Sequence, residues 1–179
     1  MTQDIRQYMT IIQESYSSDA IPEEFITTTI QGYQANVHWD KLKSAANKTK
    51  HGYTLDQGIH ALNDPHAVTY QDDMLNEDRF RSICRSSNRK LVTVVWSSVD
   101  TGEDIPTIRI IGMREATTGE VSIYKKQSIS ESDMGNLIEQ VNTDDIPEIP
   151  ANAKMVPMQT VMRTLASKFK QKNRKPHHY

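Results

Sequence analysis

The side chains best suited to chemistry in this chain are cations in short, motif-like segments. Arg79 and Arg81 are two residues apart in a strand-like run, so both should point to one face of a sheet. Arginine binds phosphate oxygens through two parallel hydrogen bonds and keeps its charge. Because two adjacent cations repel each other, this spacing favours an anion between them over plain solvent exposure. Alternatively, Glu77 could pair with one of them.

A second pair of cations, Arg109 and Arg114, flanks the end of another strand-like run. Strict alternation places positions 109 and 114 on opposite faces of a strand. Both can serve one site only if the strand ends or bulges near Gly112-Met113. Arg114 is the stronger candidate because it lies where strand gives way to helix. The alternative for Arg114 is a salt bridge to Glu120 or another acid.

A third group of candidates lies on a helix expected between Asp40, which can cap its first turn, and Gly52, which can end it. Lys43 and Lys50 share one helical face and could bind phosphate groups or simply be solvated. His51 is suited to proton transfer near neutral pH, or else interacts with the negative helix end. The inner stripe of this helix is expected to consist of Leu42, Ala45, Ala46 and Thr49.

Two motifs enclose these residues, and their order and spacing resemble the BrnT family of bacterial toxins over about residues 39–124. The first reads W-D-x-x-K-x-x-x-N-x-x-K-H-G from Trp39 to Gly52. The second reads R-I-I-x-x-R-x-A-x-x-x-E-x-x-x-Y from Arg109 to Tyr124. The resemblance implies a small ribonuclease with a RelE-like fold, part of a type II toxin–antitoxin system and held inactive by a BrnA-like antitoxin.

The function expected from this resemblance is RNA endonuclease activity that needs neither a metal nor a cofactor and that inhibits translation and growth. Cleavage requires a base, cations on the phosphate and an acid for the leaving oxygen. The expected catalytic residues are His51, Arg81 and Arg114. The expected RNA-binding residues are Lys43, Lys50, Arg79, Arg109 and Tyr124, although a tyrosine on the inner stripe of a terminal helix is more often a core residue.

One departure from the family pattern supports a different function. Gly112-Met113 stands where family members commonly have two small residues, and the bulky Met113 adjoins Arg114. The alternative is therefore a non-catalytic BrnT-like module that binds RNA or a partner protein. The two functions differ in whether His51, Arg81, Arg109 and Arg114 converge in one open cleft.

The elements that must position these residues predict an α+β fold. Strands are expected at 67–70, 79–84, 90–96 and 107–112, and their short connections favour an antiparallel four-stranded sheet. Helices should flank this BrnT/RelE-like sheet, with extra helices at both termini. We expect a helical N-terminal extension (1–35), a toxin domain (36–127), and a helical C-terminal extension with a Pro-containing linker and a basic tail (128–179).

The apolar stripes of the two extensions support these helices. In the N-terminal extension, Ile5, Tyr8, Met9 and Ile12 recur at helical spacing, and Pro22 can start a second helix. Such a pair could pack on the domain or form a partner surface. The C-terminal extension carries an acidic helix at 131–145 and a second stripe formed by Met158, Val161, Met162, Leu165 and Phe169.

Charge is unevenly distributed along a chain whose net charge is only −2. The stretch 79–90 contains five Lys or Arg and no acid, whereas 131–150 contains six acids and no Lys or Arg. This asymmetry suits an RNA-facing patch that the acidic helix folds back to cover. The single Cys84 should be a buried strand thiol. No signal peptide or membrane span is expected, so the cytoplasm is the default location, and a homo-oligomer is compatible with the sequence.

Overall fold

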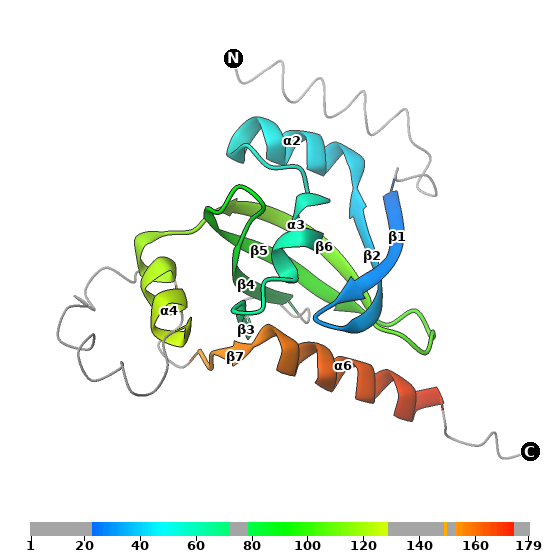
Figure 1. The fold of residues 1–179 in the computed structure, drawn as a ribbon. Helices are drawn as coiled ribbons and strands as arrows, with labels where there is room; N and C mark the ends of the chain where they lie inside the picture. Colours follow the sequence, from blue (N-terminus) through cyan, green and yellow to red (C-terminus); the bar gives the residue numbers. More distant parts are fainter. Residues whose placement is uncertain (1–22, 72–78, 129–148, 150–152, 174–179) are drawn as a thin grey trace, which may run out of the picture.

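The computed structural model describes residues 23–71, 79–128, 149 and 153–173. These residues form a mixed sheet with helices on and around it (Figure 1). The strands are β1 (Glu23–Ile30), β2 (Tyr33–Asp40), β3 (Val68–Gln71), β4 (Arg79–Arg85), β5 (Leu91–Val99), β6 (Thr107–Glu115) and β7 (Val156–Pro157). The helices are α2 (Lys41–His51), α3 (Gln57–Leu62), α4 (Thr118–Ser128) and α6 (Met158–Asn173).

The strand order in the sheet is β1-β2-β6-β5-β4-β3-β7. Strands β3 to β6 form the expected antiparallel meander, with short connections between β4, β5 and β6. The α+β class is therefore confirmed, but the expected sheet of only four antiparallel strands is wrong. The β1–β2 hairpin joins one edge through a parallel pairing of β2 with β6, and β7 joins the other edge.

The helix expected from Pro22 is wrong, because Glu23–Ile30 is strand β1. This segment is rich in Thr and Ile, whose branched Cβ atoms favour a pleated strand. Gln31 and Gly32 both have positive φ, 54° and 85°, which is the turn geometry that continues the strand twist in a two-residue hairpin. The expected helical stripe at residues 5–12 and the acidic helix at 131–145 lie outside the described residues.

One face of the sheet carries the hydrophobic core. Val92, Val94 and Trp96 alternate along β5 and are fully buried. Helix α3 lies across this face, so close that a Cβ added at Gly58 would be 3.2 Å from Ile110. Figure 1 shows α3 over the sheet and α6 along its lower side.

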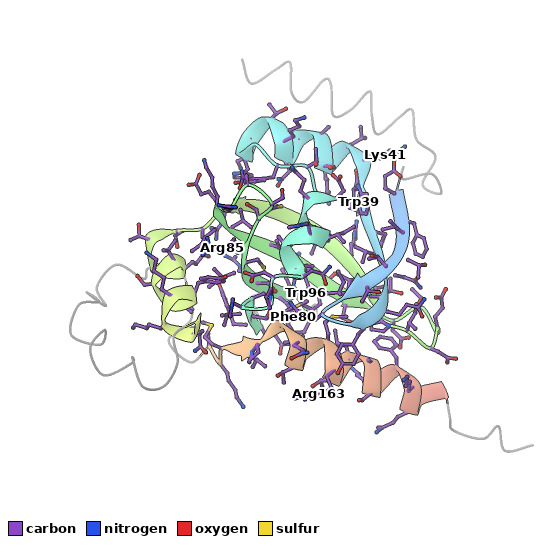
Figure 2. All side chains as sticks on the ribbon, in the orientation of Figure 1. Trp39, Lys41, Phe80, Arg85, Trp96 and Arg163 are labelled. Carbon is purple, nitrogen blue, oxygen red and sulfur yellow. The ribbon has the colours of Figure 1, made fainter. Side chains whose placement is uncertain are left out.

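The C-terminal stripe and two single residues also belong to this core. Met158, Met162, Leu165 and Phe169 of α6 are all buried. Trp96 stacks on Phe80 with ring centroids 4.5 Å apart, near the middle of Figure 2. Cys84 is buried as expected, and burial raises the pKa of its thiol.

Helix α2 begins and ends where the sequence predicted, but the expected inner stripe is wrong. The Asp40 carboxylate accepts hydrogen bonds from the N–H groups of Leu42 and Lys43, and Gly52 ends the helix in the left-handed conformation. The residues turned inward are Ser44 and Asn47, which are polar. Ser44 Oγ accepts a 2.8 Å hydrogen bond from the N–H of Leu55. The four predicted inner residues, Leu42, Ala45, Ala46 and Thr49, are all exposed.

Candidate functional site

A β-bulge in β6 brings Arg109 and Arg114 to the same face of the sheet. Arg109 lies opposite Ser97 of β5, and Arg114 lies opposite Thr93. Positions 93 and 97 are four residues apart on a strand and therefore point the same way. The register shifts by one residue between these two pairs, which reverses the alternation in β6. The bulge that the sequence required for a shared site is present.

Arg79 and Arg81 of β4 point to this same face. Arg79 lies opposite Ser97, the partner of Arg109, and Arg81 lies opposite Val95. Cross-strand partners in an antiparallel pair lie on one face. We call the four side chains Arg79, Arg81, Arg109 and Arg114 the arginine face. All four are partly exposed, and they lie on the side of the sheet opposite the core.

A buried carboxylate anchors one end of the arginine face. Glu120 of α4 is 2% exposed and binds Arg114 through two parallel contacts of 2.9 Å. The same carboxylate accepts hydrogen bonds from Thr93 Oγ1 and from the N–H of Thr117. Burial would raise the pKa of Glu120, but these hydrogen bonds outweigh it and lower the pKa below its ordinary value. Thr117 and Glu120 also form a capping box, since the N–H of Glu120 donates to Thr117 Oγ1.

Tyr70 lies beside the arginine face and was missed by the sequence analysis. It is opposite Arg81 in the β3–β4 pair and is 2% exposed. Its hydroxyl lies close to the guanidinium of Arg81. Burial raises the pKa of Tyr70, while the positive charges of Arg81 and Arg114 act against that rise. No local signal in the sequence marks this tyrosine, because its neighbours come from strand register.

Asn47 fastens α2 to the edge of β6. Strand β2 pairs with β6 only as far as Arg109, so the later part of that edge has no strand partner among the described residues. Asn47 takes the place of a strand there. Its Nδ2 donates to the carbonyls of Met113 (2.7 Å) and Tyr53 (2.8 Å), and its Oδ1 accepts from the N–H of Met113 (3.2 Å).

Met113 does not obstruct the arginine face. Its side chain is 1% exposed and belongs to the hydrophobic core. Because Met113 lies opposite Val94 and Arg114 lies opposite Thr93, the two side chains point to opposite faces of the sheet. The concern that this bulky residue crowds Arg114 is therefore not supported.

No described contact joins the cations and the histidine predicted on α2 to the arginine face. Lys43, Lys50 and His51 are exposed, and His51 is the last residue of the helix. Asn47 holds this helix beside β6, so all three side chains stand on an element that borders the strand carrying Arg109 and Arg114.

Tyr124 is a core residue in this structure. It is 2% exposed, and its hydroxyl donates a 2.8 Å hydrogen bond to Asp64 Oδ2. Arg85 lies over the ring, with its guanidinium carbon 5.8 Å from the centroid. Burial, followed by the hydrogen bond to the Asp64 carboxylate, raises the pKa of Tyr124 to about 12. The ring offers no surface on which a base could stack. The geometry therefore supports the alternative that Tyr124 is a core residue.

Two hollows in the described part of the chain are lined by none of the four arginines. One pocket of about 270 Å³ lies between β3 and the C-terminal elements, and Tyr70, Phe80, Lys154 and Val161 are among its lining residues. Another, of about 250 Å³, is lined by His60, Asn63, Asp64, Pro65, Arg85 and Ser86. The arginines thus share a sheet face and not one of these pockets. No group of three or more His, Cys, Asp or Glu residues is placed to hold a metal ion within the described residues.

Comparison with known proteins identifies the central segment of the chain. None of the described helices is both long and apolar enough to cross a membrane. No curated protein matches the chain. A family model described as the ribonuclease toxin BrnT of type II toxin–antitoxin systems matches residues 39–120, which run from the end of β2 into α4. This confirms the resemblance drawn from the two motifs: residues 39–120 are similar to the BrnT family of ribonuclease toxins.

Proposed function

We propose that this protein is an endoribonuclease toxin that cleaves RNA without a metal ion and thereby inhibits translation and growth. The observation that carries the proposal is the bulge in β6, since it turns Arg109 and Arg114 to the face that already bears Arg79 and Arg81. Four guanidinium groups on one surface suit the charged phosphate of an RNA backbone and the charge that develops in its transition state.

In this proposal the 2′-hydroxyl of RNA attacks the adjacent phosphorus and the 5′-oxygen leaves. Arg81 and Arg114 hold the phosphate and stabilise the added negative charge, while Arg79 and Arg109 position the flanking backbone. His51 accepts the proton of the 2′-hydroxyl and the leaving 5′-oxygen takes a proton from water, while Lys43 and Lys50 guide the RNA along α2. Tyr70 is a further candidate for donating a proton or hydrogen bond, because its hydroxyl lies buried beside Arg81.

A non-catalytic BrnT-like module is the second candidate, and two observations favour it. No described contact joins His51 to the arginine face, and neither described pocket is lined by the four arginines. Both outer nitrogens of Arg114 are engaged by Glu120, so this guanidinium already has an anionic partner. In this second function the arginine face binds RNA or an acidic protein, and no bond is cleaved. A BrnA-like antitoxin in the cytoplasm remains the expected partner in both cases.

Growth arrest on induced expression, with total RNA analysed on a gel, separates the two candidates. The endonuclease should arrest growth and fragment RNA, and His51→Ala and Arg81→Ala should relieve both effects while leaving the protein level unchanged. Exposed Arg163 on the outer side of α6 (Figure 2) provides the matched control, since Arg163→Ala removes a cation far from the proposed site. Intact RNA with wild-type protein present would refute the endonuclease and leave the binding module.

We also propose that the acidic residues at 131–145 restrain activity. Deleting the C-terminal extension is not a suitable test of this proposal. Removing residues 128–179 would also remove Met158, Met162, Leu165 and Phe169, which are part of the core. Neutralising the acids by Asp→Asn and Glu→Gln substitutions keeps α6 in place. Stronger growth arrest would support the restraint, and unchanged or weaker arrest would contradict it.

A further inference from the structure

The outermost strip of α2 is apolar, which is the reverse of an ordinary surface helix. Leu42, Ala45, Ala46 and Thr49 recur at helical spacing, and all four are exposed. Leu42, the largest of these side chains, is 41% exposed. The inner side of the same helix is instead polar and carries Ser44 and Asn47. A stripe with this spacing is expected to face a packing partner, but the described residues provide none on this side.

We propose that residues 5–12 of the same chain cover this strip, packing the apolar side chains of Ile5, Tyr8, Met9 and Ile12 against it. The two stripes have the same spacing, i, i+3, i+4 and i+7, and therefore the same length. The small Ala45 and Ala46 at the centre of the α2 strip allow a second helix to approach closely. Large side chains at positions 8 and 9 can fill the space above them.

The N-terminal segment joins the described structure at Glu23, next to the first turn of α2. The 22 residues before β1 end at Glu23, which is paired with Asp40, the residue that caps α2. Residues 13–22 form a connection of ten residues, which can span up to roughly 33 Å when extended. Helix α2 has 11 residues and is therefore about 16 Å long. The connection can thus place the stripe along α2 in either direction.

Charge also favours this occupant. Helix α2 carries Lys41, Lys43, Lys48 and Lys50 and no acid, giving +4. Residues 1–22 contain Asp4, Glu14 and Asp19 against Arg6, giving −2. Residues 5–12 carry only Arg6, so the charges complementary to the lysines of α2 are the acids that flank the stripe, Asp4, Glu14 and Asp19. Packing of this kind would steady the helix that carries Lys43, Lys50 and His51, and it does not depend on RNA cleavage.

Disulfide trapping in the full chain tests the proposal, because the only native cysteine, Cys84, is fully buried. The centres of two equal stripes meet whether the helices run parallel or antiparallel. We therefore choose two central pairs, Met9→Cys with Ala46→Cys and Tyr8→Cys with Ala45→Cys. The matched control pairs Met9→Cys with Lys48→Cys, which is exposed but about a third of a turn away from the strip.

The expected result is an intramolecular disulfide in at least one central pair under mild oxidation, formed much faster than in the Lys48 control. Mass spectrometry after proteolysis identifies the bond, and circular dichroism checks that each variant is folded. Three outcomes would overturn the proposal: no disulfide in either central pair, equal rates in the central and control pairs, or disulfides only between two molecules. The last outcome would assign the strip to a second copy of the chain.

Discussion

Arg114 and Glu120 are joined by two parallel hydrogen bonds of 2.9 Å, and the carboxylate is buried while the guanidinium is partly exposed. Removing the arginine leaves an uncompensated buried charge, so we expect Arg114→Ala to destabilise the protein by about 3 kcal/mol. The double variant Arg114→Ala with Glu120→Gln should recover part of that loss. Urea unfolding measures both, and equal stability of the single variant and wild type would contradict the anchoring role of the pair.

The acid stability of the protein should depend on Glu120. The pKa of this group is below its ordinary value of 4.5 in the folded protein. Its ionised form therefore contributes stability that is fully present above pH 4.5 and is lost as the pH falls through the lower native value. Unfolding titrations from neutral pH downward should show a shallower loss in Glu120→Gln than in wild type. If the free energy of unfolding fell equally with pH in the two proteins, another group would control the loss of stability in acid.

Asn47 should be essential for stability although it lies on a surface helix. Asn47→Ala removes three hydrogen bonds and leaves both backbone groups of Met113 without their partner. Each bond contributes roughly 1 kcal/mol, so we expect a loss of about 2–3 kcal/mol in the free energy of unfolding. Lys48→Ala, at an exposed position of the same helix outside its apolar strip, is the matched control and should change stability little. Similar effects of the two substitutions would refute the edge-closing role of Asn47.

Tyr124 should resist ionisation until strongly alkaline pH. Its pKa is raised from 10.0 to about 12. A raised pKa means that the protonated form contributes stability that is complete below pH 10 and is lost as the pH approaches 12. Ultraviolet titration of tyrosinate should lose a late component in Tyr124→Phe, and this variant should have a flatter alkaline stability curve. A Tyr124→Phe titration identical to wild type would contradict the assignment.

The sequence was sufficient to predict the centre of the fold. The alternating apolar runs located β3 to β6, and side-chain chemistry located the Asp40 cap and the Gly52 stop. The condition that Arg109 and Arg114 need a bulge to share a face followed from the period of a strand, and the structure meets it. These features depend on local geometry, which neighbouring residues determine.

Features that depend on distant contacts were predicted poorly. Pro22 suggested the start of a helix, but pairing with β2 and the Gln31-Gly32 turn make this segment a strand. The stripe on α2 predicted an inner face, but the bonds of Asn47 to Met113 turned the polar side inward. Tyr70 was missed because only the β3–β4 register places it beside Arg81.

The arginine face should make RNA binding sensitive to salt. For a single strand, the logarithm of the affinity falls with the logarithm of the salt concentration by roughly 0.7 per phosphate contacted. Arg79→Ala or Arg81→Ala should therefore weaken binding and reduce the salt slope by about that amount. Fluorescence anisotropy with a labelled RNA over a salt series measures both quantities. An unchanged slope would mean that the substituted arginine contacts no phosphate.

The central claim, that the arginine face is where RNA is cleaved, is tested most directly by comparing wild type with Arg109→Ala. Arg109 lies on that face opposite Ser97 of β5, and circular dichroism checks that the substituted protein is folded. Purified proteins are incubated with single-stranded RNA in the presence of EDTA, with Arg163→Ala as control. We predict cleavage by wild type and Arg163→Ala and a large loss of cleavage in folded Arg109→Ala. Wild-type cleavage by Arg109→Ala, or intact RNA with all three proteins, would contradict the account.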